Sequence, residues 1–311
     1  LPQHQHSAGN GKGQVDTMIS EISSTTKSGE RLTIDIRDPY SSGIAIKEIT
    51  GLGPVKADLS MDRYALIDGA FLKGVRVGTR NVVLTLIPWG EDIQQLRRKL
   101  YKYFGVSETI SLEVITDWVS AKSDFIVESV EPNIFAERQE VQVSLIGLDP
   151  YWKASSAQIQ KVVGFNDTVP QFEFPFFSEG NHKLVFGDMT NSTGKDIRYH
   201  GDAPAGVTIT FTFYGTVENL IISNTTFDET MSISRAGQFY AGEKLVVDTR
   251  PGKKSIVHHA GGRSSFITGV LAPGSEWIKM HPGINTIALQ YSGGSEDMGV
   301  SIEYESLYRG I

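Results

Sequence analysis

Three stretches of the chain contain residue types that catalysis or phosphate binding needs, but their spacing or context is wrong. Residues 262–266 (GRSSF) depart from the Gly-x-Ser-x-Gly pattern of a nucleophile elbow and lie among expected strands. Residues 189–196 (MTNSTGKD) lack the first glycine of a phosphate-binding loop and have Asp196 where that loop has its magnesium-binding hydroxyl. The glycines within residues 9–13 have no strand before them and no helix after them. We therefore expect neither a serine hydrolase nor a nucleotide site.

Metal and acid–base chemistry also lack a suitable arrangement. His258 and His259 are adjacent, so on a strand they point to opposite faces and cannot share a metal ion. One of them is expected in the core and the other in solvent. No pair stands out among the 36 acidic residues as a general acid and base, so nothing argues for a glycosidase. The chain has no cysteine, which removes disulfides, thiolate metal sites and cysteine nucleophiles. We expect no enzyme, no cofactor and no metal.

A saccharide-binding surface is the remaining possibility for a small-molecule site. Trp277 and Tyr240 are weak candidates for a platform on which a sugar ring could stack. The second half of the chain has a single tryptophan, so a core or edge aromatic is the simpler interpretation of Trp277.

Length and charge favour an ordinary two-domain protein. The 311 residues are enough for two domains, and the composition is 40% hydrophobic and 21% charged. The net charge of −7 divides into −4 up to Trp152 and −3 after it, so neither half is a basic nucleic-acid-binding module. No run approaches the roughly 18 apolar residues of a membrane span, and the amino terminus lacks the pattern of a secretory signal. We expect no membrane insertion.

The first half predicts strands, one helix and a long hairpin extension. Residues 91–104 have acidic side chains in the first turn, basic ones in the second half and apolar ones on one face, as a helix requires. The basic run is expected to be a solvated helix face. Residues 57–73 have a poor apolar pattern, with Asp68-Gly69 at the expected hairpin tip. The strands around them predict a β-sandwich that carries this helix and this hairpin.

The second half predicts strands almost throughout. Residues 207–213 alternate apolar and threonine side chains strictly, and similar short strands recur as far as residue 304. Many short strands separated by regular turns predict a jelly-roll sandwich. The fold class is therefore mainly β.

Residues 140–152 (EVQVSLIGLDPYW) mark the expected junction between the two halves. An alternating strand runs into a turn, and we expect Pro150, Tyr151 and Trp152 to anchor the exit from the first domain. Trp152 should be buried against that domain. The predicted organisation is a polar arm or an expression remnant over 1–17, an N-terminal domain over 18–152, a linker over 153–171 and a C-terminal domain over 172–311.

Taken in order, short motifs of the chain resemble the distal tail proteins of long-tailed, non-contractile bacteriophages. In the first half they are Gly51-Leu52-Gly53, Asp68-Gly69-Ala70, Arg80-Asn81, the single helix and Asp149-Pro150-Tyr151-Trp152. In the second half they are Gly206-Val207 with its strand, residues 219–226, Ala241-Gly242-Glu243, Asp248-Thr249, Trp277, residues 282–285 and residues 308–311. The resemblance covers residues 18–311. Residues before Met18 have no counterpart, and residues 153–206 are too few for the inserted carbohydrate-binding module of larger members.

The resemblance implies a homohexameric ring at the distal end of the phage tail, in the virion. The first domains would close a belt around a channel below the last ring of the major tail tube protein. The galectin-like second domains would project outward. A tail-associated lysin or fibre protein and receptor-binding or baseplate proteins would attach around the ring. DNA would pass through the channel without sequence-specific binding, which the acidic balance of the chain suits.

The subunit contacts of such a ring are expected in the poorly patterned hairpin, because a segment that cannot bury itself often pairs with a neighbour. The candidate contact residues are Arg63, Tyr64, Asp68, Phe71 and Arg80. A mobile surface loop is the alternative for the hairpin. The alternative function is a host cell-wall saccharide-binding tail adhesin that acts through a lectin-like C-terminal domain.

Overall fold

The computed structural model describes residues 19–64, 68–155, 160–163, 190–234, 237–294 and 297–311. The chain divides into two compact units, which are Leu1–Pro150 together with Ile311, and Tyr151–Gly310. The arm expected over 1–17 and most of the linker expected over 153–171 lie outside the described residues. The four predicted domain ranges stay predictions.

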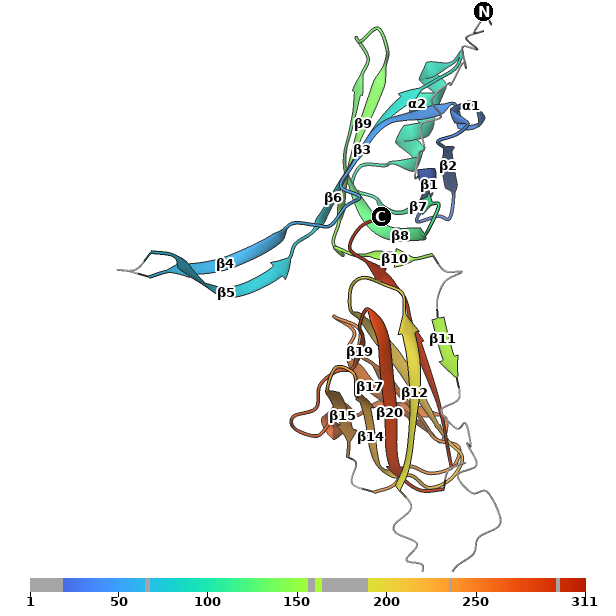
Figure 1. Ribbon diagram of the computed structural model, residues 1–311. Coiled ribbons are helices and arrows are strands. Elements are labelled where there is room, and N and C mark those ends of the chain that lie inside the picture. The colour runs from blue at the N-terminus through green and yellow to red at the C-terminus, as the bar shows by residue number, and fades with distance from the viewer. Residues whose placement is uncertain (1–18, 65–67, 156–159, 164–189, 235–236, 295–296) are drawn as a thin grey trace, which may run out of the picture. The chain divides into compact units, whose positions relative to one another are not determined.

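The first unit is built on one antiparallel sheet (Figure 1). Its strands follow the order β2-β1-β7-β8-β9-β6-β3. Their bounds are β1 (Ile19–Thr26), β2 (Arg31–Asp35), β3 (Ile44–Thr50), β6 (Arg80–Pro88), β7 (Thr109–Thr116), β8 (Ser120–Asn133) and β9 (Glu140–Gly147). The predicted mainly β fold is confirmed. The first half was expected to form a β-sandwich, and its strands are hydrogen-bonded in one continuous sheet.

The 14-residue strand β8 gives this sheet its continuity. Its first half pairs with β7 and its second half pairs with β9, with a register shift between Val127 and Ser129. Buried side chains alternate with more exposed ones along β2, β7 and the first half of β8, where Phe125 and Val127 face the core. A bulge bends a strand, so one strand can belong to both halves of a curved sheet.

Helix α2 (Ile93–Tyr103) packs against β1 and β6 and confirms the predicted helix. The Asp92 side chain accepts a hydrogen bond from the Gln95 backbone N–H, which caps the first turn. Leu100 and Phe104 are buried beneath the helix. Lys102 on the exposed side pairs with Glu30 at 2.7 Å, as expected of a solvated basic face. A second, four-residue helix α1 (Pro39–Ser42) was not predicted.

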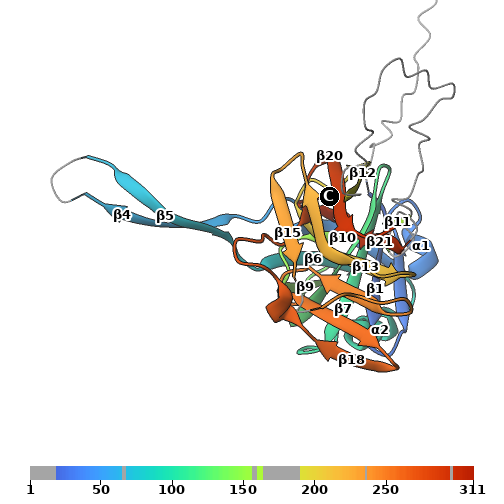
Figure 2. The same ribbon diagram turned by 90° about the horizontal axis from the view of Figure 1, so that it is seen from below.

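A two-stranded sheet of β4 (Ala57–Arg63) and β5 (Ala70–Val77) forms the predicted hairpin. It is inserted between β3 and β6, which pair with each other in the main sheet. In both ribbon views no other labelled element of the first unit runs alongside it (Figures 1 and 2). Six of the seven residues of β4 and all eight of β5 are exposed.

The second unit is a sandwich of two antiparallel sheets. One sheet has the order β11-β21-β13-β16-β17-β18, with β19 also pairing β13, and the other has the order β12-β20-β14-β15. The bounds in the first sheet are β11 (Gln160–Val163), β13 (Ala205–Phe213), β16 (Lys244–Asp248), β17 (Ser255–Ala260), β18 (Arg263–Phe266), β19 (Lys279–Met280) and β21 (Met298–Tyr304). Those in the second are β12 (Thr190–Tyr199), β14 (Glu218–Asn224), β15 (Glu229–Ile233) and β20 (Gly283–Ser292). β10 (Trp152–Ala154) pairs with β22 (Leu307–Tyr308), and the 3₁₀ helix η2 covers Thr268–Val270.

The core of this unit lies between the two sheets. The alternating strand β13 is the clearest prediction confirmed, because every second side chain from Ala205 to Phe213 is buried. Phe213 stacks on Phe239 with ring centroids 4.6 Å apart. The MTNSTGKD stretch falls largely on β12, so its polar residues belong to a strand and not to a loop.

Tyr199 closes one end of the sandwich with two hydrogen bonds. Its hydroxyl donates to the carbonyl oxygen of Ala203 and accepts from the backbone N–H of Leu307, both at 2.8 Å. Burial raises the pKa of the Tyr199 phenol well above its ordinary value. A neutral, buried hydroxyl therefore ties β12 to the carboxyl-terminal strand β22.

Candidate functional site

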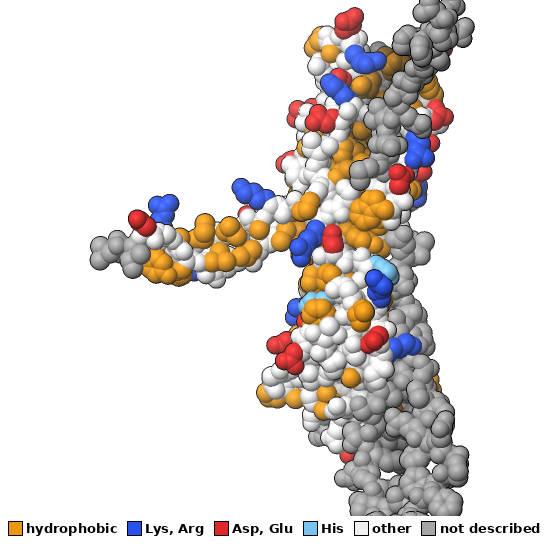
Figure 3. All heavy atoms as spheres, in the orientation of Figure 1, with side chains coloured by type: hydrophobic (Ala, Val, Ile, Leu, Met, Phe, Trp, Pro, Cys, Tyr) orange, Lys and Arg blue, Asp and Glu red, His pale blue; other side chains and the backbone are white. Residues whose placement is uncertain are grey.

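The β4–β5 hairpin has one apolar face and one polar face. Directly opposed residues of an antiparallel pair share a face, and the register pairs Leu59 with Val75 and Met61 with Leu72. Together with Val77 these residues form the apolar hairpin face, and their side chains are 40% to 57% exposed. Figure 3 shows the hydrophobic side chains gathered along the hairpin. A two-stranded hairpin is marginally stable alone in water, so its exposed apolar face is a candidate binding surface.

A bulge keeps the apolar face continuous. Ser60 lies opposite Gly74 and Met61 lies opposite Leu72, so Lys73 is the extra residue between the two pairs. In a regular ladder Lys73 would lie opposite Met61 and would interrupt the apolar face. The bulge leaves Lys73 free to pair with Asp62 on the polar face.

The polar face carries both ion pairs of the hairpin, whereas Arg63 lies two residues after Met61 and therefore on the apolar side, near the tip. Asp58 pairs with Arg76 at 3.6 Å, and Asp62 pairs with Lys73. Both pairs are exposed, so they add little stability but keep this face in water. Near the tip Tyr64 and Phe71 contact each other with ring centroids 5.4 Å apart.

A buried arginine holds the base of the hairpin. Arg80 at the start of β6 donates through Nη1 to the carbonyl oxygens of Gly51 (2.7 Å), Leu52 (3.2 Å) and Gly53 (2.7 Å). Nε and Nη2 donate to the carbonyl oxygen of Pro150 at 3.1 and 2.6 Å. Burial lowers the pKa of the guanidinium, and the negative charge of Asp149 acts in the opposite direction. Five hydrogen bonds offset the cost of burying this charge.

Gly51 lets the chain leave the sheet at this point. Its φ of +85° is in the left-handed region, and a Cβ placed there would lie 1.9 Å from the carbonyl oxygen of Asn81. The backbone of residue 51 therefore packs directly on β6, where only glycine fits.

The predicted contact residues divide into two groups. Arg63, Tyr64, Asp68 and Phe71 are exposed on the hairpin, where a neighbour could reach them, and their contact role stays a prediction. Arg80 is completely buried and bound to carbonyl groups of its own chain, so its expected place at a subunit contact is corrected to the hairpin base. The sequence analysis did not predict the apolar hairpin face. Its signal in the sequence is the spacing of two residues between Leu59 and Met61 and between Val75 and Val77.

The residues of the expected interdomain anchor lie on both sides of the division between the units. Pro150 is the last residue of the first unit's continuous stretch, and its carbonyl is held by Arg80. Tyr151 and Trp152 begin the second unit, where Trp152 is fully buried and lies opposite Tyr308. Packing of Trp152 against the first domain stays a prediction.

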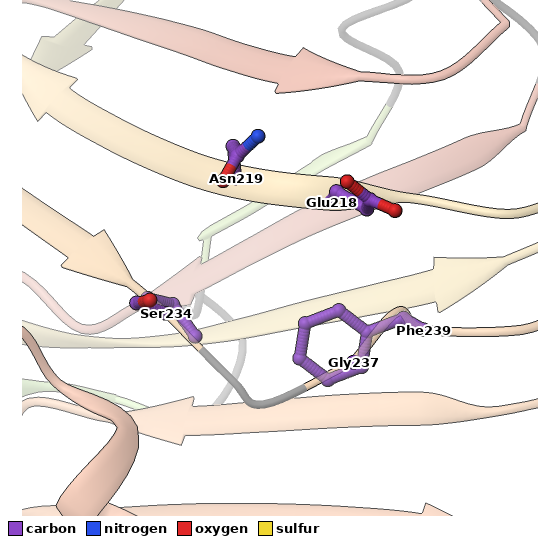
Figure 4. Close-up of a pocket in the computed structure, with 6 residues that line it drawn as sticks. Glu218, Asn219, Ser234, Gly237 and Phe239 are labelled. Atoms are coloured by element: carbon purple, nitrogen blue, oxygen red, sulfur yellow. The ribbon is translucent and has the colours of Figure 1, made fainter.

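The two aromatic residues of the possible sugar platform are not brought together by any contact in the described structure. Trp277 is partly buried against the core of the second unit, and Lys254 lies over its ring at 5.6 Å. Tyr240 is exposed. A hollow of about 150 Å³ in this unit is lined by other residues, including Glu218, Asn219 and Phe239 (Figure 4). The saccharide surface therefore gains no support from a shared aromatic cleft.

The histidine pair behaves as its spacing predicted. His258 is buried, with Nε2 at 2.9 Å from Oε2 of Glu243, whereas His259 is half-buried, with Nδ1 at 2.8 Å from the Ser264 hydroxyl. Within the described ranges, no group of three or more His, Asp or Glu side chains could hold a metal ion. No helix of the described part of the chain is long and apolar enough to cross a membrane.

Comparison with known proteins relates this architecture to phage tails. Residues 200–308 match the family model described as siphovirus-type tail component, C-terminal domain. The crystal structure of Dit from phage SPP1 covers 92% of this chain and 98% of its own, with 13% identity and a TM-score of 0.57. The structure of the phage P2 baseplate in its activated conformation with Ca contains a similar chain, with 10% identity and a TM-score of 0.42. The match covers 93% of this chain and 98% of the baseplate chain. No curated protein sequence matches.

Residues 200–308 are thus similar to the C-terminal domain of siphovirus-type tail components. Over nearly its whole length the chain has the fold of Dit, the protein solved from phage SPP1. The resemblance inferred from the sequence motifs is confirmed.

Proposed function

We propose that this chain is the structural hub of a bacteriophage tail tip, in which six copies form a closed ring. The observation that carries the proposal is the exposed, one-sided hairpin in a chain that has the Dit fold and is similar to siphovirus-type tail components. The SPP1 protein is itself described as a paradigm of the hub adsorption apparatus in phages that infect Gram-positive hosts. A hub acts by binding its neighbours, so it needs interaction surfaces and no catalytic group.

The physical argument for a ring is the need to cover the apolar hairpin face. Its five apolar side chains are largely exposed in a single copy. A contact between different surfaces of successive copies closes into a ring when the rotation between copies is right, and every hairpin is then covered. Ring formation would also protect the open edges of the sheets.

The proposed ring joins other parts of the tail and leaves a channel for DNA. We assign one face to the major tail tube protein and the other to a tail-associated lysin or fibre protein, with receptor-binding or baseplate proteins around it. The net charge of −7 per chain disfavours binding of the phosphate backbone, so DNA would pass without sticking. The galectin-like second unit would supply an outward docking domain.

Solution mass tests the ring directly. Six times the chain mass of 34.1 kDa predicts a particle of about 205 kDa by mass photometry. The measurement is made on the chain alone and after mixing with the tail tube and lysin proteins, because some rings close only on a partner. A chain that stays monomeric in every mixture would contradict the hub.

A further inference from the structure

In the second unit, the sheet that contains β13 ends at strand β18. The four residues of this strand, Arg263–Phe266, are all exposed. Its register with β17 runs without a shift, and no proline interrupts it. A bulge or a proline is a common way to block the edge of a sheet, and β18 has neither. The strand therefore presents an open edge.

The register decides which backbone groups face this open edge. The backbone N–H of Ile267 donates to the carbonyl oxygen of Ile256 at 2.9 Å, so these residues form a hydrogen-bonded pair one position beyond β18. Hydrogen-bonded and non-hydrogen-bonded pairs alternate in an antiparallel ladder, so Ser264 and Phe266 belong to non-hydrogen-bonded pairs with β17. Their N–H and C=O groups point away from β17. Within the described ranges, no other backbone segment binds them.

The edge strand β15 of the other sheet shows how a neighbouring segment can cover such groups. The carbonyl oxygen of Thr230 accepts a hydrogen bond from the backbone N–H of Glu276 at 2.8 Å, and that of Ser232 accepts one from Ala272 at 2.9 Å. Residues 270–276 thus lie along the outer edge of β15. In the part of the chain that the structure describes, β18 has no such cover, so its outward groups remain free to bind a partner.

An apolar row leads across the outer face of the sheet to the open edge. Val246, Val257 and Phe266 lie opposite one another on β16, β17 and β18. Leu245 and Ile256, the preceding residues on two of these strands, are buried in the core, so the row lies on the opposite face. The two valines are half-buried and Phe266 is 79% exposed. A side chain added beside Phe266 would extend the row and should be apolar.

The next row on the same face is polar and basic. Lys244, His259 and Ser264 lie opposite one another on the same three strands. Arg263 begins β18 on its other face, and neither it nor Lys244 has an ion-pair partner among the described residues. Asp248, beyond the apolar row, is already paired with a neighbouring arginine at 2.6 Å. A side chain added beside Ser264 should therefore be acidic.

We propose that an extended segment of a partner tail protein pairs with β18 as an added antiparallel strand. It carries an apolar side chain beside Phe266 and, two residues later, an acidic side chain beside Ser264. In strand addition the backbone hydrogen bonds supply affinity and alternate side chains supply specificity. The outward N–H and C=O groups of Ser264 and Phe266 supply the backbone contacts. This inference rests on the proposed docking role of the second unit and specifies its surface and the chemistry of its partner.

A fluorescent peptide, Thr-Thr-Val-Thr-Glu-Thr-Thr, tests the site on the full-length chain by fluorescence anisotropy. In an antiparallel added strand its valine lies beside Phe266 and its glutamate beside Ser264, so we expect saturable binding below millimolar concentration. The matched control, Thr-Thr-Glu-Thr-Val-Thr-Thr, has the same composition and charge but exchanges the two side chains. It should bind about three-fold more weakly or worse. No binding of the first peptide at millimolar concentration, or equal binding of both, would overturn the proposed partner chemistry.

Backbone pairing is tested on both partners. Methylating the peptide nitrogens of valine and glutamate removes the donors that face β18 and should weaken binding about ten-fold or more. Methylating the two threonine nitrogens that follow these residues, which face away from β18, should not. In the chain, Ser264→Pro removes the outward N–H and should weaken binding similarly, whereas Ser264→Ala keeps it. The peptide series uses the unchanged chain, so a poorly folded Ser264→Pro variant cannot decide the result.

Mass photometry of the same samples separates this inference from the ring. A particle of ring mass that does not bind the peptide would overturn the edge site and leave the hub standing. A monomer that binds the peptide would support the edge site and contradict the ring. Binding that is unaffected by methylation of valine and glutamate would overturn strand addition. A pair of copies formed by the unchanged chain and lost in Ser264→Pro would assign the open edge to a second copy instead.

Discussion

The carbonyl oxygen of Pro150 accepts two hydrogen bonds from the guanidinium of Arg80, one from Nε at 3.1 Å and one from Nη2 at 2.6 Å. The same guanidinium binds the chain where it leaves β3 for the hairpin. One side chain thus fixes both the base of the hairpin and the end of the strand segment that precedes the second unit.

Replacing Arg80 by alanine should destabilise the first unit by about 3–5 kcal/mol, because four carbonyl groups lose their donor and the buried side chain leaves a cavity. Arg80→Lys should recover only part of this, since an ammonium cannot reproduce the planar fork. Urea unfolding measures the change. Arg76→Ala on the exposed hairpin is the control and should cost less than about 1 kcal/mol. Equal losses of stability in Arg80→Ala and Arg76→Ala would contradict the role of Arg80 at the base of the hairpin.

Gly51→Ala should also destabilise the first unit, by about 2–4 kcal/mol, because its Cβ would overlap the carbonyl oxygen of Asn81 and its φ is positive. Gly53→Ala is the matched control, since a Cβ there meets no atom within 4 Å. Thermal unfolding of both variants gives the comparison. A Gly51→Ala chain as stable as the Gly53→Ala chain would show that residue 51 does not pack on β6.

Tyr199→Phe should destabilise the second unit by about 1–3 kcal/mol, because the buried carbonyl of Ala203 and N–H of Leu307 both lose their partner. Tyr240→Phe, at an exposed tyrosine of the same unit, should leave stability unchanged. Urea titration at pH 7 distinguishes the two. A loss of similar size in both variants would argue against the role of the Tyr199 hydroxyl.

The second unit should lose stability at alkaline pH. Burial raises the pKa values of Tyr199, Tyr291, Tyr304 and Tyr308, so the folded state holds these protons more tightly than the unfolded chain does. Their contribution is fully present below the unfolded pKa of about 10 and is lost as pH rises through the folded values. Urea midpoints at pH 8, 10 and 11 should fall in that order. In Tyr199→Phe the urea midpoint should fall less steeply with pH. An unchanged dependence on pH would show that ionisation of Tyr199 does not contribute to the loss of stability.

Val75→Asp should abolish assembly while leaving the folded monomer intact. Val75 is exposed on the apolar hairpin face, so a charge there costs the single chain little but would be buried in the proposed contact. Mass photometry and thermal unfolding are read together. Ser60→Asp on the polar face should retain assembly, and a ring formed as well by Val75→Asp as by the unchanged chain would contradict a role for this face.

The sequence predicted those elements in which the spacing of apolar residues matches the side that is buried. The strict alternation of β13 and the amphipathic helix α2 each have one side in a core, and their residues show this directly. β12 was missed because its first residues, TNSTGKD, are polar. The faces of the hairpin were missed because Lys73 shifts the alternation by one residue, which becomes visible only with the register of its partner strand. The role of Arg80 depends on carbonyl groups 27 to 70 residues away in the chain, which no local pattern encodes.

The hairpin begins and ends at neighbouring points of the sheet, since β3 and β6 pair with each other as far as Thr50 and Val83. Its length is therefore independent of the core of the first unit. Adding two residues to each of β4 and β5 would lengthen the ribbon by about 7 Å and would keep every apolar side chain on its own face. The reach of the hairpin can thus be tuned by insertion, with the contacts of Arg80 and the main sheet left as they are.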